Sequence, residues 1–123
     1  MTRINLVSPS ELSDLHLGAE YRELPRVFRL VKKAIARGER PNLNEPSEYV
    51  LGSGHVRFFY PRLGFIVNRF AKLVAECKAR GRAVQYTSIP DISDIPSEWM
   101  NDYMPTSNAL ELNRARIKER TRA

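Results

Sequence analysis

The chain has 123 residues, with 20 lysines and arginines against 14 aspartates and glutamates, and a formal net charge of +6. This length suits one domain with a modest hydrophobic core, so we expect a single domain over residues 1–123. The excess of positive charge favours a polyanionic partner such as nucleic acid, although other small basic proteins share it. The single cysteine, Cys77, excludes an internal disulfide bond and is expected to be a buried small hydrophobic residue.

The sequence gives little support for a metal-binding protein or a membrane protein. One cysteine and two histidines do not supply a zinc site without recruited carboxylates, so we expect no metal. No apolar run reaches the ~18 residues that a membrane-spanning helix needs. Arg3 and Asn5 stand where a signal peptide would have its apolar stretch. We therefore expect a cytoplasmic protein without a membrane partner.

The first predicted helix covers about residues 8–37. Ser8 is a plausible N-cap, Pro9 suits the first helical position, and Glu11 completes a capping-box pattern. Gly38 predicts the end of this helix.

Two prolines fall inside predicted helices. Pro25 removes a backbone hydrogen bond from the first helix, which predicts a kink near residues 21–25, with two shorter helices as the alternative. The second predicted helix covers about residues 55–80 and ends at Gly81, and Pro61 is expected to interrupt its first turns.

The remaining segments predict loops and one further helix. Residues 39–54 are rich in turn formers, and residues 87–108 contain three prolines and no alternating pattern of a strand. A third helix is predicted from about Asn108 to the C-terminus. The predicted fold is an all-α, compact three-helix domain with long connecting loops.

The first predicted helix carries a basic stripe. At 100° per residue, four cationic side chains fall in one narrow sector, opposite the apolar face: Arg22, Arg26, Arg29 and Lys33. Like charges at this spacing repel each other, and a phosphate backbone would relieve the repulsion, although a solvated helix face is the alternative. The third predicted helix adds a second basic patch: Arg114, Arg116, Lys118, Arg120 and Arg122.

The N-terminus presents a candidate nucleophile. Thr2 is small enough for Met1 to be trimmed from it, which would expose an α-amine with a reference pKa of about 7.7–8.0. Glu23 lies beside the basic stripe, with His16 and Glu20 at nearby helical positions. A carboxylate among arginines is normally an ion-pair partner, and a catalytic role for Glu23 requires a nucleophile close by.

Four stretches carry a resemblance to a known family: MTRINL, HLGAEYRELPRVF, LGSGHVRFFY and QYTSIPDISDIPSEWMNDYMP. They closely resemble the phage-type pyrimidine-dimer DNA glycosylase/AP lyases, and the similarity extends over essentially the whole chain. This resemblance implies a compact helical domain in which the N-terminal segment packs between helices. It also implies a DNA repair enzyme that excises cyclobutane pyrimidine dimers and nicks the strand by β-elimination.

The resemblance also implies roles for particular residues. Thr2 would supply the nucleophilic α-amine, which forms a covalent imine with the sugar, and Glu23 would be the catalytic carboxylate. The remaining positions would bind DNA: Arg3, His16, Arg22, Arg26, Arg116 and Arg120. Leu15 stands where the family archetype has a polar residue.

The implied partners are double-stranded DNA with pyrimidine dimers or abasic sites, and non-specific duplex DNA, bound by a monomer without a cofactor. Two other functions fit the residues. One is an AP lyase without dimer specificity, and the other is a non-catalytic basic DNA-binding module.

Overall fold

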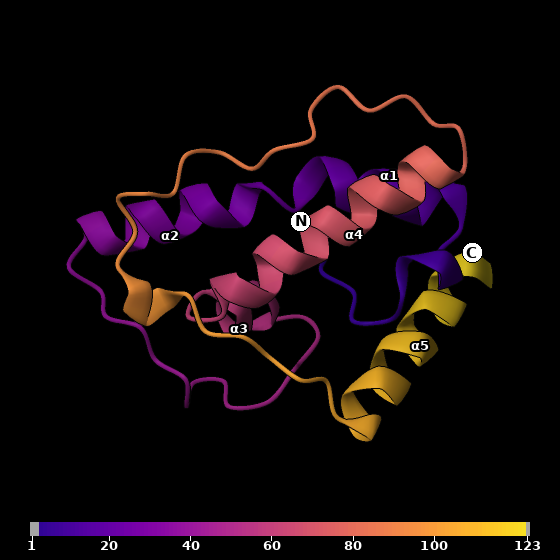
Figure 1. Cartoon of the computed structure of the whole chain (residues 1–123). Coiled ribbons are helices and arrows are strands. Elements are labelled where there is room, and N and C mark those ends of the chain that lie inside the picture. Colours follow the sequence, from indigo (N-terminus) through magenta and orange to yellow (C-terminus); the bar gives the residue numbers. More distant parts are fainter. Residues whose placement is uncertain (1–2, 123) are drawn as a thin grey trace.

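A computed structural model describes residues 3–122, and their side chains as far as residue 120. Its elements are, in chain order, η1 (Pro9–Glu11), α1 (Asp14–Glu23), α2 (Arg26–Ala36), α3 (His55–Phe59), α4 (Leu63–Ala79), η2 (Ser97–Trp99) and α5 (Ser107–Arg122). Within the described range there is no strand, only an isolated bridge between Arg62 and Met100. The all-α prediction is confirmed (Figure 1).

Prolines divide the first two predicted helices. Leu24 and Pro25 keep right-handed helical dihedral angles, but Pro25 has no N–H for the hydrogen-bond ladder, so α1 and α2 are separate helices. The favoured single kinked helix is therefore wrong, and the alternative of two shorter helices holds. Pro61 breaks the second predicted helix into α3 and α4, as expected for its first turns.

The start of the first helix also differs from the prediction. The hydroxyl of Ser8 accepts from the N–H of Ser10 and caps only η1, a single 3-10 turn. The N-cap of α1 is Ser13, whose hydroxyl accepts from the N–H of His16 at 3.2 Å. The residues around Ser8 carry the pattern of a helix start, but the chain turns once more before α1 begins.

Glycine ends two of the helices, as predicted. Gly38 has φ 85° and Gly81 has φ 73°, the left-handed region that glycine adopts without strain. After α4, the N–H of Arg82 donates to the carbonyl of Cys77 at 2.9 Å, which is the Schellman arrangement. The prediction for the third helix agrees with α5 to within one residue.

Helix α4 lies at the centre of the hydrophobic core. Helices α1 and α3 and the η1 turn pack against it. Its fully buried side chains include Leu63, Ile66 and Leu73, and burial raises the pKa of the Cys77 thiol. Cys77 is therefore the buried small hydrophobic residue that was predicted.

The N-terminal segment, residues 3–8, runs between α5 on one side and α1 and α4 on the other (Figure 1). Ile4, Asn5, Leu6 and Val7 are all buried. Since the chain enters the core here, its first described residue, Arg3, is held close to both α1 and α5. The expected packing of this segment between helices is confirmed.

The long connection from α4 to α5 runs past α2 and carries the η2 turn (Figure 1). Tyr86 stacks on Tyr21 with ring centroids 5.0 Å apart, and the Tyr21 hydroxyl donates to the Tyr86 carbonyl at 2.8 Å. Trp99 in η2 is buried. This connection is therefore anchored to the core, and it leads the chain across to α5.

Candidate active site

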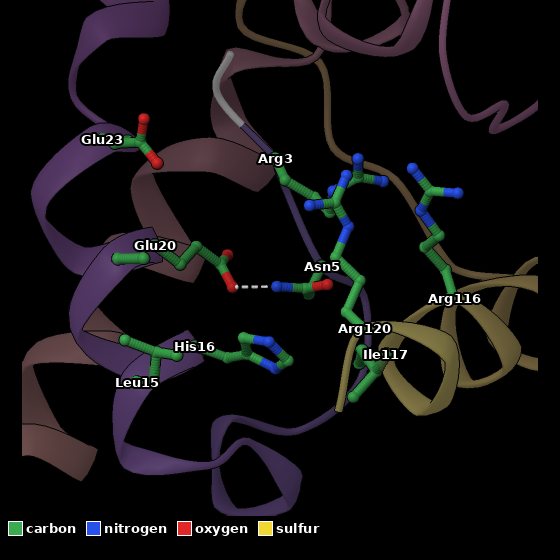
Figure 2. Close-up of a pocket in the computed structure, with 10 residues that line it drawn as sticks. Arg3, Asn5, Leu15, His16, Glu20, Glu23, Arg116, Ile117 and Arg120 are labelled. Atoms are coloured by element: carbon green, nitrogen blue, oxygen red, sulfur yellow. Dashed lines mark hydrogen bonds between the residues drawn. The ribbon is translucent and has the colours of Figure 1, made fainter. Parts of the chain in front are cut away.

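A pocket of about 590 Å³ lies between α1, the N-terminal segment and α5. Figure 2 shows side chains of α1 on one wall, side chains of α5 on the opposite wall, and Arg3 and Asn5 between them. The lining residues are Arg3, Asn5, Leu15, His16, Ala19, Glu20, Glu23, Arg116, Ile117 and Arg120.

Helical spacing accounts for both walls. His16, Glu20 and Glu23 follow one another at intervals of four and three residues, so they share one face of α1. Arg116 and Arg120 share one face of α5 for the same reason. The pocket forms because the N-terminal segment holds these two faces apart.

The two glutamates of the pocket have different surroundings. The Glu20 carboxylate is 1% exposed, accepts from Arg69 at 2.8 and 3.0 Å, and accepts from the Asn5 amide at 2.8 Å. The Glu23 side chain is 27% exposed, and among the described residues it forms an ion pair with Arg26 at 3.4 Å. Glu20 is thus held within the buried network, whereas Glu23 is partly exposed and faces the pocket.

Three arginines bring positive charge to the same pocket. Burial lowers the pKa of the Arg3 guanidinium, and the nearby charges of Arg120 and Arg116 lower it further. Among the described residues, Arg116 forms an ion pair with Glu119 at 3.5 Å. The pocket therefore concentrates like charges that an anion would stabilise.

Three buried side-chain nitrogens in the pocket lack a hydrogen-bond partner among the described residues. Nη1 of Arg3, Nε of Arg116 and Nδ1 of His16 are buried and make no hydrogen bond within the described chain. A buried donor left unpaired costs about 1–3 kcal/mol. The two guanidinium nitrogens can only donate, so acceptor oxygens such as those of a phosphate group would satisfy them.

The structure brings together five of the eight residues proposed from the sequence: Arg3, His16, Glu23, Arg116 and Arg120. Arg22 and Arg26 do not line the pocket and are exposed beside it. Thr2 lies outside the described residues, and the chain joins it directly to Arg3.

The basic stripe is exposed along α1 and α2, as the periodicity predicts. Arg26, Arg29 and Lys33 line a shallow depression of about 200 Å³ together with Leu30. The stripe therefore forms a second cationic surface, separate from the pocket.

We compared the chain with known protein families. The family model described as pyrimidine dimer DNA glycosylase matches residues 1–90. The chain belongs to this family. Its resemblance to the dimer glycosylases is thereby confirmed, and membership indicates a DNA glycosylase that acts on DNA.

The region matched by the family model holds the N-terminal segment, α1 and the basic stripe. Helix α5, with Arg116 and Arg120, follows after its end. The structure nevertheless joins α5 to the matched region through the pocket, so both parts contribute to one site. Across residues 3–122, no helix is both long and apolar enough to span a bilayer.

The sequence analysis did not identify the buried polar residues that support the pocket. These are Asn5, Tyr49, His55, Arg69 and Asn113. Arg69 had a detectable signal, because it shares the apolar face of α4 with Ile66 and Leu73. A charged residue on an apolar helix face needs a buried partner, which here is Glu20.

Proposed function

We propose that this protein excises cyclobutane pyrimidine dimers from DNA and then cleaves the strand as an AP lyase, through an imine with the α-amine of Thr2. The observation that carries the proposal is the pocket itself. It is lined by Glu23 and by Arg3, the residue that follows Thr2, together with buried side-chain nitrogens that lack a hydrogen-bond partner among the described residues.

The proposed nucleophile is the amine that Thr2 exposes after removal of Met1. Consecutive Cα atoms lie 3.8 Å apart, so the peptide link to Arg3 limits how far residue 2 can be from the pocket. Positive charges near an amine disfavour its protonated form. We therefore expect Arg3, Arg116 and Arg120 to increase the fraction of uncharged, nucleophilic amine at neutral pH.

The proposed reaction has two steps. The amine attacks C1′ of the damaged nucleotide as the bond from C1′ to the base breaks, and one amine proton goes to the departing base. The C1′–O4′ bond then breaks, the second amine proton goes to O4′, and the opened sugar is left as an imine. The imine acidifies the proton on C2′. Removal of that proton expels the 3′ phosphate by β-elimination, and hydrolysis of the imine then releases the enzyme.

Glu23 is the proposed catalytic carboxylate. Its negative charge would stabilise the positive charge that develops on the sugar as the base departs, and it would take part in proton transfer. Its partial exposure and its long contact with Arg26 support this role.

The remaining basic residues are proposed to hold DNA. Arg3, Arg116, Arg120 and His16 would bind phosphate oxygen in or near the pocket, since all four line it, and buried nitrogens of all but Arg120 make no hydrogen bond among the described residues. The exposed Arg22 and Arg26 would contact the duplex backbone beside it.

The size of the pocket supports an extruded nucleotide as its occupant. Pockets that bind small molecules have volumes of about 300–1,000 Å³, and this one has about 590 Å³. Reaching C1′ within a duplex requires distortion, and glycosylases gain access by turning a nucleotide out of the stack.

The test uses three duplexes: one with a single cyclobutane dimer, one with an abasic site, and one undamaged. Each is incubated with the protein, with and without borohydride, which reduces an imine to a stable adduct. We expect cleavage and adducts on both damaged duplexes, with the adduct at residue 2. Cleavage of the abasic duplex alone would indicate an AP lyase without dimer specificity. Binding without any cleavage would indicate a non-catalytic module.

A further inference from the structure

Side chains from three parts of the fold hold the backbone of the N-terminal segment. The Ile4 N–H donates to Nε2 of His55 at 2.8 Å, and the Tyr49 hydroxyl donates to the Ile4 carbonyl at 3.0 Å. The N–H groups of Leu6 and Val7 donate to Oδ1 of Asn113 at 2.6 and 3.1 Å. We call Tyr49, His55 and Asn113 the N-terminal clamp.

Asn113 connects this segment to the phosphate-binding wall proposed above. It is completely buried on α5, about one turn before Arg116 and two turns before Arg120. Besides accepting two backbone N–H groups, it donates from Nδ2 to Oδ1 of Asn5 at 2.9 Å. One side chain on α5 therefore holds the N-terminal segment at three points.

The hydrogen bonds continue from Asn5 into the core. The Asn5 amide donates to Glu20, and Glu20 is held by Arg69 of α4. Arg69 also donates to the Val7 carbonyl. Helices α1, α4 and α5 are thus tied to the same segment by one continuous buried network.

His55 acts on the other end of the segment in a defined tautomer. Its Nδ1 lies 2.8 Å from the Val50 carbonyl, which can only accept, so the proton is on Nδ1 and Nε2 accepts from Ile4. The ring packs edge-on against Tyr49 and Phe59, with centroids 5.4 and 5.9 Å away. The backbone two residues after Thr2 is therefore attached to a rigid aromatic cluster.

We propose that Asn113 and His55 are positioning residues for the reaction, because they hold the backbone that carries the Thr2 amine against the pocket. This inference rests on the proposed imine mechanism. Neither residue lines the pocket, so each would act through the segment that it holds. A misplacement of about 1 Å at a reacting group can cost roughly 100-fold in rate.

Two variants remove the two ends of the clamp separately. His55→Phe keeps an aromatic ring beside Tyr49 and Phe59 but removes the acceptor for the Ile4 N–H. Asn113→Ala removes the acceptor for Leu6 and Val7. Glu111→Ala is the matched control, because Glu111 is an exposed residue on the same helix as Asn113 and does not line the pocket.

Three quantities are measured for each folded variant. These are the affinity for a duplex with an abasic site, the single-turnover rate of borohydride trapping at saturating DNA, and the hydrogen exchange of the Ile4, Leu6 and Val7 amides. The affinity shows whether a variant still binds DNA, so that a loss of trapping can be assigned to the chemical step. The exchange rate shows whether the hydrogen bonds of the clamp are still formed. Circular dichroism establishes that each variant is folded at the assay temperature.

We expect trapping to fall by at least about 10-fold in His55→Phe and in Asn113→Ala, while affinity changes by less than about 3-fold, since the pocket side chains remain. Exchange should accelerate at Ile4 in the first variant and at Leu6 and Val7 in the second. Glu111→Ala should match the wild type in all three measurements.

Trapping at the wild-type rate in either folded variant, despite faster exchange, would overturn the inference for that residue. A parallel loss of affinity and trapping would also overturn it, because the effect would then be on binding. If one variant does not fold, the other decides. Failure of the wild type to trap would instead contradict the imine mechanism, and unaltered exchange in the variants would separately show that no clamp exists.

Discussion

Arg69 and Glu20 form a buried ion pair between α4 and α1, in which two guanidinium nitrogens lie 2.8 and 3.0 Å from the two carboxylate oxygens. Both side chains are at most 3% exposed. The pair lies one turn from Glu23, which faces the same pocket and, within residues 3–120, has no such buried ion-pair partner. Two glutamates on one helix face therefore have separate roles, one in the structure and one proposed for catalysis.

Glu20→Gln is expected to destabilise the protein. The change leaves the buried charge of Arg69 without a counter-charge, and breaking a buried pair in this way costs about 3–5 kcal/mol. Urea unfolding of the variant measures the loss. Glu76→Gln is the control, because Glu76 pairs with Arg80 at a solvent-accessible site near the end of α4, where the pair should contribute only about 0–1 kcal/mol. Equal effects of the two changes would contradict the structural role of Glu20.

Glu23→Gln is expected to change the rate of cleavage strongly and the stability of the protein little, the opposite of Glu20→Gln. The exposed pair with Arg26 contributes about 0–1 kcal/mol, so the variant should stay folded. Removal of one negative charge from a basic site should leave DNA binding unchanged or tighter. Single-turnover cleavage of dimer DNA should fall by roughly 100-fold or more, because the charge is needed in the transition state. Cleavage near the wild-type rate would show that Glu23 is only an ion-pair partner and not the catalytic carboxylate.

The α-amine of Thr2 is expected to be essential. A protein with one additional glycine before Thr2 keeps every side chain but moves the amine by one residue. Its trapping by borohydride on abasic DNA should disappear, while its salt-dependent DNA binding should persist. Intact mass identifies the terminus in each preparation, and full cleavage by the extended protein would exclude this amine as the nucleophile.

The exposed basic stripe is expected to contribute to the salt dependence of DNA binding. Each phosphate contact releases counterions, so the slope of log affinity against log salt should decrease by about one in Arg26→Gln. The control is Arg57→Gln. Arg57 forms an ion pair with Glu39 at 2.9 Å, and it lines neither the pocket nor the depression on the basic stripe. An unchanged slope in Arg26→Gln would mean that this face does not contact DNA.

Mild acid is expected to destabilise the fold through His55. Burial lowers the pKa of His55, with Arg3 acting in the same direction and Glu20 and the bond to Val50 opposing it. The unfolded chain therefore binds this proton more readily. The contribution of neutral His55 is fully present above its unfolded pKa of about 6.5 and is lost as pH falls, by at most about 1.4 kcal/mol per pH unit.

Urea unfolding of the wild type and of His55→Phe between pH 7 and pH 5 measures this effect. The wild type should lose stability over this range, and His55→Phe should lose less. Carboxylates do not obscure the comparison, because groups with lowered pKa values, such as Glu39 at about 2, lose their contribution below about pH 4.5. Parallel pH profiles would show that the pKa of His55 is the same in the folded and unfolded states, which would contradict its lowering by burial.

Local chemistry determined much of the helix pattern from the sequence alone. Gly38 and Gly81 end their helices because only glycine adopts the required left-handed dihedral angles without strain. The basic stripe follows from helical periodicity, which acts over a few residues. The Pro25 break was foreseen only as an alternative, because a proline that keeps helical dihedral angles can bend a helix or divide it, depending on how the flanking turns pack.

Only the tertiary structure decided which polar groups meet. Asn113 binds the N–H of Leu6 across 107 residues, and Arg69 binds Glu20 across 49. Neither partner can be identified from spacing, because such contacts form only when the buried N-terminal segment brings three helices together. The distinction between Glu20 and Glu23 has the same origin. Both are carboxylates on one helix face. Arg69 lies in the core, where it forms an ion pair with Glu20, whereas Glu23 faces the pocket.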